Sequence, residues 1–89
     1  MPDPVSWFLI EQGWRVLDRE GDELGKVGEA LGDPQNDIFD GLTVATRLLG
    51  KPRYIPSERV TTIYEGEVRT DLAPGEIRLH EEYEGSPRV

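Results

Sequence analysis

The feature that most constrains the fold is the stretch of residues 13–27, which has the pattern of a β-hairpin. Its first half alternates, so that Trp14 and Val16 share one face of the predicted strand. Residues 20–22 then supply a turn, because Gly21 tolerates positive φ and Asp22 can bond its own backbone. A second strand leaves the turn, and we expect the rest of the chain to add strands to this pair.

The second strand is predicted over residues 24–31, but its alternation is imperfect. Leu24 lies on one face, whereas Val27 lies on the other. Gly25 stands at this slip and Gly28 follows it, which predicts a bulge or a sharp coil at this point.

Further strands are expected over residues 38–46, 53–55 and 67–72, with a corner at 56–59 and a bend between Val60 and Ile63. The apolar residues of the first of these fall on even positions and should share one face, namely Ile38, Leu42, Val44 and Leu48. A turn or another bulge is expected at Asp40-Gly41. The last strand alternates cleanly, so its inward face should carry Val68, Thr70 and Leu72.

Two segments leave alternatives open. Residues 5–10 are apolar and could form a short strand or a single helical turn against the sheet. Residues 76–83 have spacings that fit helix or strand, and we favour a short helix that covers the core with Ile77 and Tyr83. Residues 84–89 are expected to form a loose tail.

Six short strands with turn residues every 8–12 positions are typical of a small closed or partly closed β-barrel. The predicted fold is therefore mainly β: a six-stranded barrel domain over residues 5–72. A C-terminal helical turn and flexible tail would follow over residues 73–89.

The order of these pieces resembles that of a known family, the PRC-barrel domain. The opening matches in its spaced residues, which are Gly13, Val16, Asp18, Gly21 and Gly25-Lys26-Val27. The second half agrees through Tyr54-Ile55-Pro56, Val60 and Ile63, followed by a closing strand at residues 68–72. The resemblance covers residues 6–72, and it depends on the order and spacing of the three pieces rather than on any one of them.

The resemblance implies a six-stranded barrel that binds or scaffolds rather than catalyses. The family includes the cytoplasmic part of a photosynthetic reaction-centre subunit and the last domain of a ribosome maturation factor, besides many small stand-alone proteins. The sequence carries neither a fused partner domain nor a membrane helix, so we do not expect those specialised roles to transfer. The family has no shared catalytic residues to carry over.

The net charge of the chain limits the classes of partner that it is expected to bind. The chain has 18 acidic and 10 basic side chains, for a net charge of -8. Nucleic acids and anionic membranes are bound mainly by lysine and arginine, so neither is an expected partner, and a ribosome-associated role is the least favoured. The longest apolar run, residues 7–10, is far shorter than a membrane helix or a signal peptide requires. A cytoplasmic location is the default expectation.

No residue set amounts to an active site. There is no cysteine, and His80 is the single histidine, expected to be solvated near the end of the chain. The glycines of residues 21–27 lack the serine or threonine of a phosphate-binding loop. The run Asp18-Arg19-Glu20-Gly21-Asp22 does not match the ligand spacing of a calcium loop. We therefore expect no catalytic residue, cofactor or metal ion, and no enzyme activity.

The aromatic residues are the remaining candidates for function. Trp7, Phe8 and Trp14 lie within eight residues, and Tyr54 lies further along. They could simply fill the core, or they could stay exposed and anchor a protein contact. We favour a non-catalytic interaction or scaffold module that uses these four residues, with an unknown protein partner and self-association as a homodimer. The alternative is a small regulatory domain that binds a ligand or a cation at the acidic turn of residues 18–23.

Overall fold

The computed structural model describes residues 3–46, 51–80 and 82, and within them one sheet holds six strands. The strands are β1 (Arg15–Leu17), β2 (Glu23–Asp33), β3 (Ile38–Ala45), β4 (Arg53–Pro56), β5 (Val60–Tyr64) and β6 (Glu67–Thr70). Short 3₁₀ turns join or flank them: η1 (Trp7–Leu9), η2 (Pro34–Asn36), η3 (Ser57–Arg59) and η4 (Glu76–Leu79). The mainly β class is confirmed.

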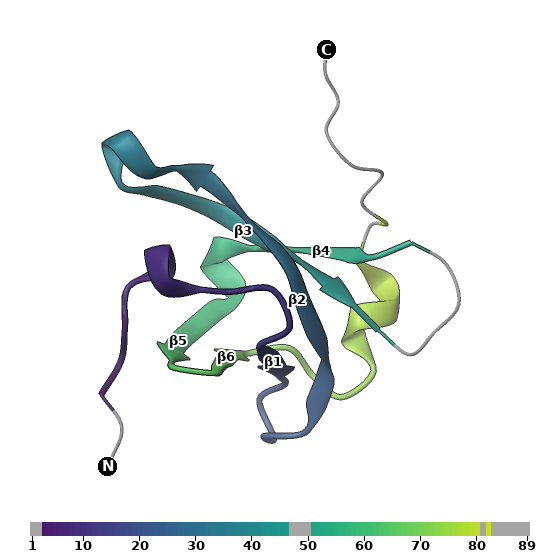
Figure 1. Ribbon diagram of the computed structural model, residues 1–89. Coiled ribbons are helices and arrows are strands. Elements are labelled where there is room, and N and C mark those ends of the chain that lie inside the picture. The colour runs from purple at the N-terminus through teal and green to yellow at the C-terminus, as the bar shows by residue number, and fades with distance from the viewer. Residues whose placement is uncertain (1–2, 47–50, 81, 83–89) are drawn as a thin grey trace.

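The sheet runs in the order β4-β3-β2-β1-β6-β5. Its neighbours are antiparallel except for β1 and β6, which are parallel. Figure 1 shows the sheet curling around its own core, with the β2–β3 hairpin reaching past the other strands.

The sheet is not closed, because β4 and β5 are its two outer strands and no ladder between them exists in the described residues. The prediction allowed a closed or a partly closed barrel, and the six predicted strands are present in a sheet that does not close. Each outer strand is bonded instead to a segment near a chain end. The backbone N–H of Val5 donates to the Ile63 carbonyl at 2.8 Å, and Arg53 forms a β-bridge with Glu82. Both edges are thus partly covered without closure.

The hairpin of β1 and β2 is confirmed. The turn depends on Asp18 rather than Asp22, since the Asp18 carboxylate accepts the backbone N–H groups of Glu20 and Asp22 at 2.8 and 3.0 Å. Gly21 has φ +87°, a conformation that glycine adopts without strain. The register slips next to Gly25 and again between Val27 and Ala30, which confirms the predicted bulges.

A third register shift, between β2 and β3, changes which face of β3 is buried. The pairing moves from Leu31–Gly41 to Gly32–Phe39, so Asp40 is the extra residue. Because one inserted residue reverses the alternation, Phe39 packs against the core, whereas Ile38 is 50% exposed. The prediction that Ile38 shares the inward face of Leu42 and Val44 is therefore wrong. Leu48, assigned to the same face, lies outside the described residues.

The core is the set of side chains that the strands turn inward. Its buried hydrophobic members are Val16, Leu17, Val27, Leu42, Val44, Ile55, Val68, Leu72 and Ile77. Val68, Thr70 and Leu72 are all buried, as the alternation of the last strand predicted. The predicted corner after Pro56 is a 3₁₀ turn. Gly66 has a positive φ, which is typical of a tight turn, and it directly precedes β6.

The two segments for which the sequence allowed either a strand or a helix both contain a 3₁₀ helical turn. At the N-terminal side, η1 is capped by Ser6, whose hydroxyl accepts the Phe8 N–H at 3.2 Å. At the C-terminal side, η4 covers the core with Ile77, while Tyr83 and the tail lie outside the described residues. Within the described chain, no helix has the length and hydropathy needed to span a bilayer.

Candidate functional site

The structure brings together two of the four predicted surface aromatics. Trp7 and Phe8 are neighbours in η1, with ring centroids 4.8 Å apart. Trp14 is half-buried and packs against the core just before β1. Tyr54 is half-buried in β4, where its hydroxyl donates to the Asp40 carbonyl at 2.9 Å. Only Trp7 and Phe8 therefore lie on a common surface, and Trp14 and Tyr54 occupy separate positions.

Phe39 is the partner that sequence reasoning missed. Its ring stacks on the Trp7 indole with centroids 5.3 Å apart and planes 14° apart. The indole N–H donates to the Asp37 carboxylate at 3.0 Å, across 30 positions of sequence. Asp37 is held at φ +55° at the end of η2, where the chain turns back into β3. The sequence did offer a signal, because a bulge was one of the two alternatives predicted at Asp40-Gly41, and this bulge turns Phe39 inward.

Exposed apolar side chains surround this stack. Phe8 and Leu9 follow Trp7 in η1 and are 52% and 55% exposed. Ile38 is also 50% exposed, but it precedes Phe39 in β3 and therefore points to the opposite face of that strand. We call Trp7, Phe8, Leu9 and Phe39 the aromatic patch. Figure 1 shows η1 near the outer end of the β2–β3 hairpin, and the stack of Trp7 on Phe39 joins η1 to β3. Contiguous exposed apolar surface of this kind marks interaction sites.

A hollow of about 430 Å³ adjoins the patch between η1 and β2. The residues that line it are Trp7, Phe8, Ile10, Gln12, Gly28, Glu29, Ala30 and Pro34. Glu29 brings the only charged side chain in this set, because all other members are apolar, small or uncharged. The hollow can therefore hold an apolar group that carries a positive charge at its end.

The second cluster of polar side chains joins η3, η4 and the loop between β6 and η4. Arg59 donates to Asp71 at 2.6 Å and to both carboxylate oxygens of Glu76 at 2.8 and 3.2 Å. Glu76 also accepts the backbone N–H of Ala73 at 3.0 Å and faces His80 Nε2 at 3.2 Å. These bonds fasten η4 over the core, where Ile77 is buried.

His80 is not a solvated residue, and that prediction is wrong. Its side chain is only 14% exposed, and Nδ1 lies 3.2 Å from the Tyr54 carbonyl oxygen. Its own carbonyl accepts the Arg53 guanidinium at 3.0 Å. The reason is that η4 folds back against β4, so the residue that ends η4 meets the strand. Both ring nitrogens face oxygen acceptors, so the arrangement holds the segment rather than activating a nucleophile.

Glu76 has the largest resolved shift among the acidic groups. The Arg59 guanidinium, the Ala73 N–H and His80 lower the pKa of Glu76 from its ordinary 4.5 to about 2. The Arg69 guanidinium likewise lowers the pKa of Glu67, with Arg15 contributing. A carboxylate whose pKa is lowered in the folded state stabilises that state above its unfolded pKa, and this stabilisation is lost as the pH falls.

We therefore expect the melting temperature to fall as the pH decreases from about 4.5 to about 2, with Glu76 as a main cause. Glu76→Gln should lower the melting temperature at neutral pH by a few degrees and make this acid decline shallower. Circular dichroism melts across that pH range measure both effects. Glu65→Gln, an exposed position in the β5–β6 turn, is the matched control and should leave the profile unchanged. Identical acid declines for the wild type and Glu76→Gln would contradict the assignment.

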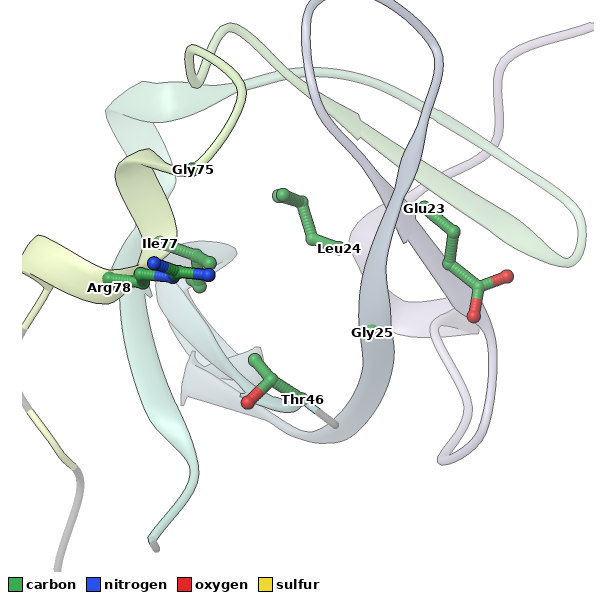
Figure 2. A pocket seen from close by; sticks show the side chains of 7 residues that line it. All are labelled: Glu23, Leu24, Gly25, Thr46, Gly75, Ile77 and Arg78. Carbon is green, nitrogen blue, oxygen red and sulfur yellow. The ribbon is translucent and has the colours of Figure 1, made fainter. Parts of the chain in front are cut away.

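A third feature is a hollow of about 440 Å³ between β2 and η4, shown in Figure 2. Leu24 points across it toward the η4 side, whereas Glu23 points away from it. Ile77 and Thr46 contribute the other walls, and Arg78 lies at the rim. The described residues that line this hollow include the apolar Leu24 and Ile77 and the polar or charged Glu23, Thr46 and Arg78.

The acidic turn of residues 18–23 is organised by backbone bonding. Asp18 is buried, and the oxygen that accepts from Glu20 and Asp22 is already occupied by those bonds. Among residues 3–46, 51–80 and 82, no three histidine, aspartate or glutamate side chains are grouped so that they could hold a metal ion. The turn therefore has a structural explanation, and cation binding there stays an untested alternative.

The sequence matches no protein-family model, and no curated protein is significantly similar to it.

Proposed function

We propose that this chain is a non-catalytic protein-interaction module and that the aromatic patch is its binding surface. One observation carries the proposal: two of the four large hydrophobic side chains that are exposed in the described residues, Phe8 and Leu9, are neighbours in this patch. Aromatic anchors with exposed apolar neighbours are the features that dominate binding energy at protein interfaces. Scattered exposed hydrophobic residues would need no such explanation.

The patch is also held in a defined shape. Trp7 is fixed by the stack on Phe39 and by its bond to Asp37. A surface that is ordered before binding loses less conformational entropy when a partner docks. This rigidity supports a role in recognition rather than a fortuitous exposure of apolar groups.

The other polar clusters support a non-catalytic role because their bonds have structural explanations. Arg59, Glu76 and His80 fasten η4, and Asp18 forms the β1–β2 turn. The resemblance to the PRC-barrel family points the same way, since that family works through contacts. We include in the proposal a PRC-barrel-like scaffold role in the cytoplasm.

A photoreactive side chain tests this proposal directly. Placing benzoylphenylalanine at position 9, within the patch, should give a discrete covalent adduct when cells of the source organism are irradiated. Position 79 is the matched control, because Leu79 is 83% exposed but lies on η4, outside the patch. Mass spectrometry of the adduct identifies the partner. Adducts of equal yield from both positions, or none from position 9, would refute the proposal.

The same experiment tests the predicted homodimer. An adduct between two copies of the chain, together with a solution mass that stays dimeric on dilution, would show self-association through the patch. Phe8→Ala should then convert the dimer into a monomer in light scattering. A monomeric mass with an adduct to another protein would retain the interaction module and dismiss the dimer.

A further inference from the structure

We propose that the aromatic patch binds a basic segment of another protein, in which a lysine or arginine side chain enters the hollow beside Trp7 and apolar neighbours cover the patch. This inference rests on the proposed function and adds to it the chemistry of the partner. It follows from the distribution of charge around the patch and from the shape of the hollow.

The two chain segments that build the patch carry acidic side chains and no basic ones. Residues 3–14 and 27–46, which build the patch and the β2–β3 hairpin, contain no lysine or arginine. They contain six acidic residues: Asp3, Glu11, Glu29, Asp33, Asp37 and Asp40. All the basic residues of the chain therefore lie elsewhere in the sequence.

The ion pairs between described residues involve other acids, as Arg59 pairs with Glu76 and Arg69 with Glu67. No ion pair between described residues reaches Glu29 or Asp40. In the described part of the chain, the patch therefore combines apolar surface with carboxylates that no ion pair compensates, and these attract positive charge.

The hollow fits a long basic side chain. Trp7, Ile10 and Pro34 offer apolar walls to an aliphatic stem, and Glu29 offers a carboxylate to the charged end. An aromatic ring beside the stem adds attraction for a cation. A neutral apolar side chain would contact the same apolar residues, but it would bring no positive charge to the exposed Glu29 carboxylate.

The negative charge of the segments that build the patch also disfavours the alternative partners, namely a second copy of the chain, a nucleic acid and an acidic protein segment. A second copy that docked patch to patch would bring the same acidic surface against itself, because a two-fold contact pairs identical surfaces. A nucleic acid or an acidic protein segment would meet repulsion from the same carboxylates. Charge complementarity therefore favours a different protein with a basic, apolar segment.

A tripeptide series tests the inference on the full-length protein. The probes are acetylated, amidated leucine-arginine-leucine, its counterpart with neutral citrulline in place of arginine, and its counterpart with glutamate. The reporter is the indole N–H resonance of Trp7 in nitrogen-proton correlation spectra. Trp14 is the other tryptophan of the chain and serves as an internal control, because it packs against the core.

The arginine peptide should shift the Trp7 resonance saturably, leave Trp14 unchanged, and bind about threefold or more tightly than the citrulline peptide. Glu29→Gln should remove most of that preference, whereas Glu65→Gln, in the distant β5–β6 turn, should keep it. Added salt should weaken the arginine peptide more than the citrulline peptide.

The inference fails if the citrulline peptide binds as tightly as the arginine peptide, if the glutamate peptide binds equally well, or if no probe shifts Trp7. Different results would overturn this inference and the proposed interaction module. A crosslinked partner whose contact segment lacks lysine and arginine would overturn the basic partner and retain the module. The absence of any adduct from position 9 would overturn the module itself.

Discussion

Replacing Leu42 by alanine should lower the free energy of unfolding by about 2–5 kcal/mol, because this side chain is fully buried in β3 and its removal leaves a cavity. Replacing Ile38 by alanine should change it by less than about 0.5 kcal/mol. Both residues are large aliphatics of one strand, and simple alternation places both in the core. The pair therefore tests the bulge at Asp40, which separates their environments.

Urea unfolding followed by circular dichroism measures the two free energies. In a domain of this size, a loss of 1 kcal/mol corresponds to about 4–8 °C in melting temperature. If Leu42→Ala does not fold, Leu42→Val gives a measurable version, with an expected cost of about 1 kcal/mol for the missing methylene. Equal losses for the substitutions at 38 and 42 would mean that β3 alternates without interruption and that Ile38 is a core residue.

A second pair separates stability from binding. Phe8 belongs to the aromatic patch and is 52% exposed, so Phe8→Ala should weaken crosslinking from position 9 although the protein stays folded. A retained melting temperature with a reduced adduct is the signature of an interface residue. Leu42→Val, by contrast, should lower the melting temperature and leave the adduct unchanged under folding conditions.

Gly41→Ala has the second large effect, with an expected loss of about 1–3 kcal/mol. A Cβ atom at this position would overlap the backbone carbonyl oxygen of Ile55 in the neighbouring strand β4. It would also lie 2.6 Å from the Tyr54 hydroxyl oxygen and 2.8 Å from its Cζ atom. The tyrosine could rotate away, but the strand backbone could move only by breaking the β3–β4 pairing.

The control for this prediction is Gly21→Asn. Gly21 has open space around it and a positive φ that asparagine tolerates better than most residues, so the cost should be well below that of Gly41→Ala. Chemical unfolding compares the two variants, and near-ultraviolet circular dichroism reports the displaced Tyr54 ring. Wild-type stability for Gly41→Ala would show that β3 and β4 are not packed as closely as the structure places them.

Local signals in the sequence were sufficient for much of the fold. The turn around Gly21, the corner after Pro56 and the inward face of Val68 and Leu72 each depend on residues within a few positions of one another. Backbone preference and short-range alternation act at that distance, so these elements could be predicted from sequence.

The tertiary structure decided everything that depends on register or on contacts between distant segments. A single bulge exchanged Ile38 for Phe39 in the inward position, and that exchange created the stack under Trp7. The two edges of the sheet form hydrogen bonds with segments near the chain ends instead of with each other. The His80 ring lies against β4, with Nδ1 facing the Tyr54 carbonyl oxygen, instead of being exposed to solvent.

The sequence by itself thus determined a mainly β chain, its turns, and the acidic character of residues 27–46. Only the tertiary structure decided that Trp7 meets Asp37 and Phe39 of this segment. The physical reason is that alternation specifies a face relative to its own strand, whereas one extra residue in a bulge reverses that face. Which side chains meet across 30 positions, as Trp7 and Asp37 do, is set by strand pairing and packing in three dimensions.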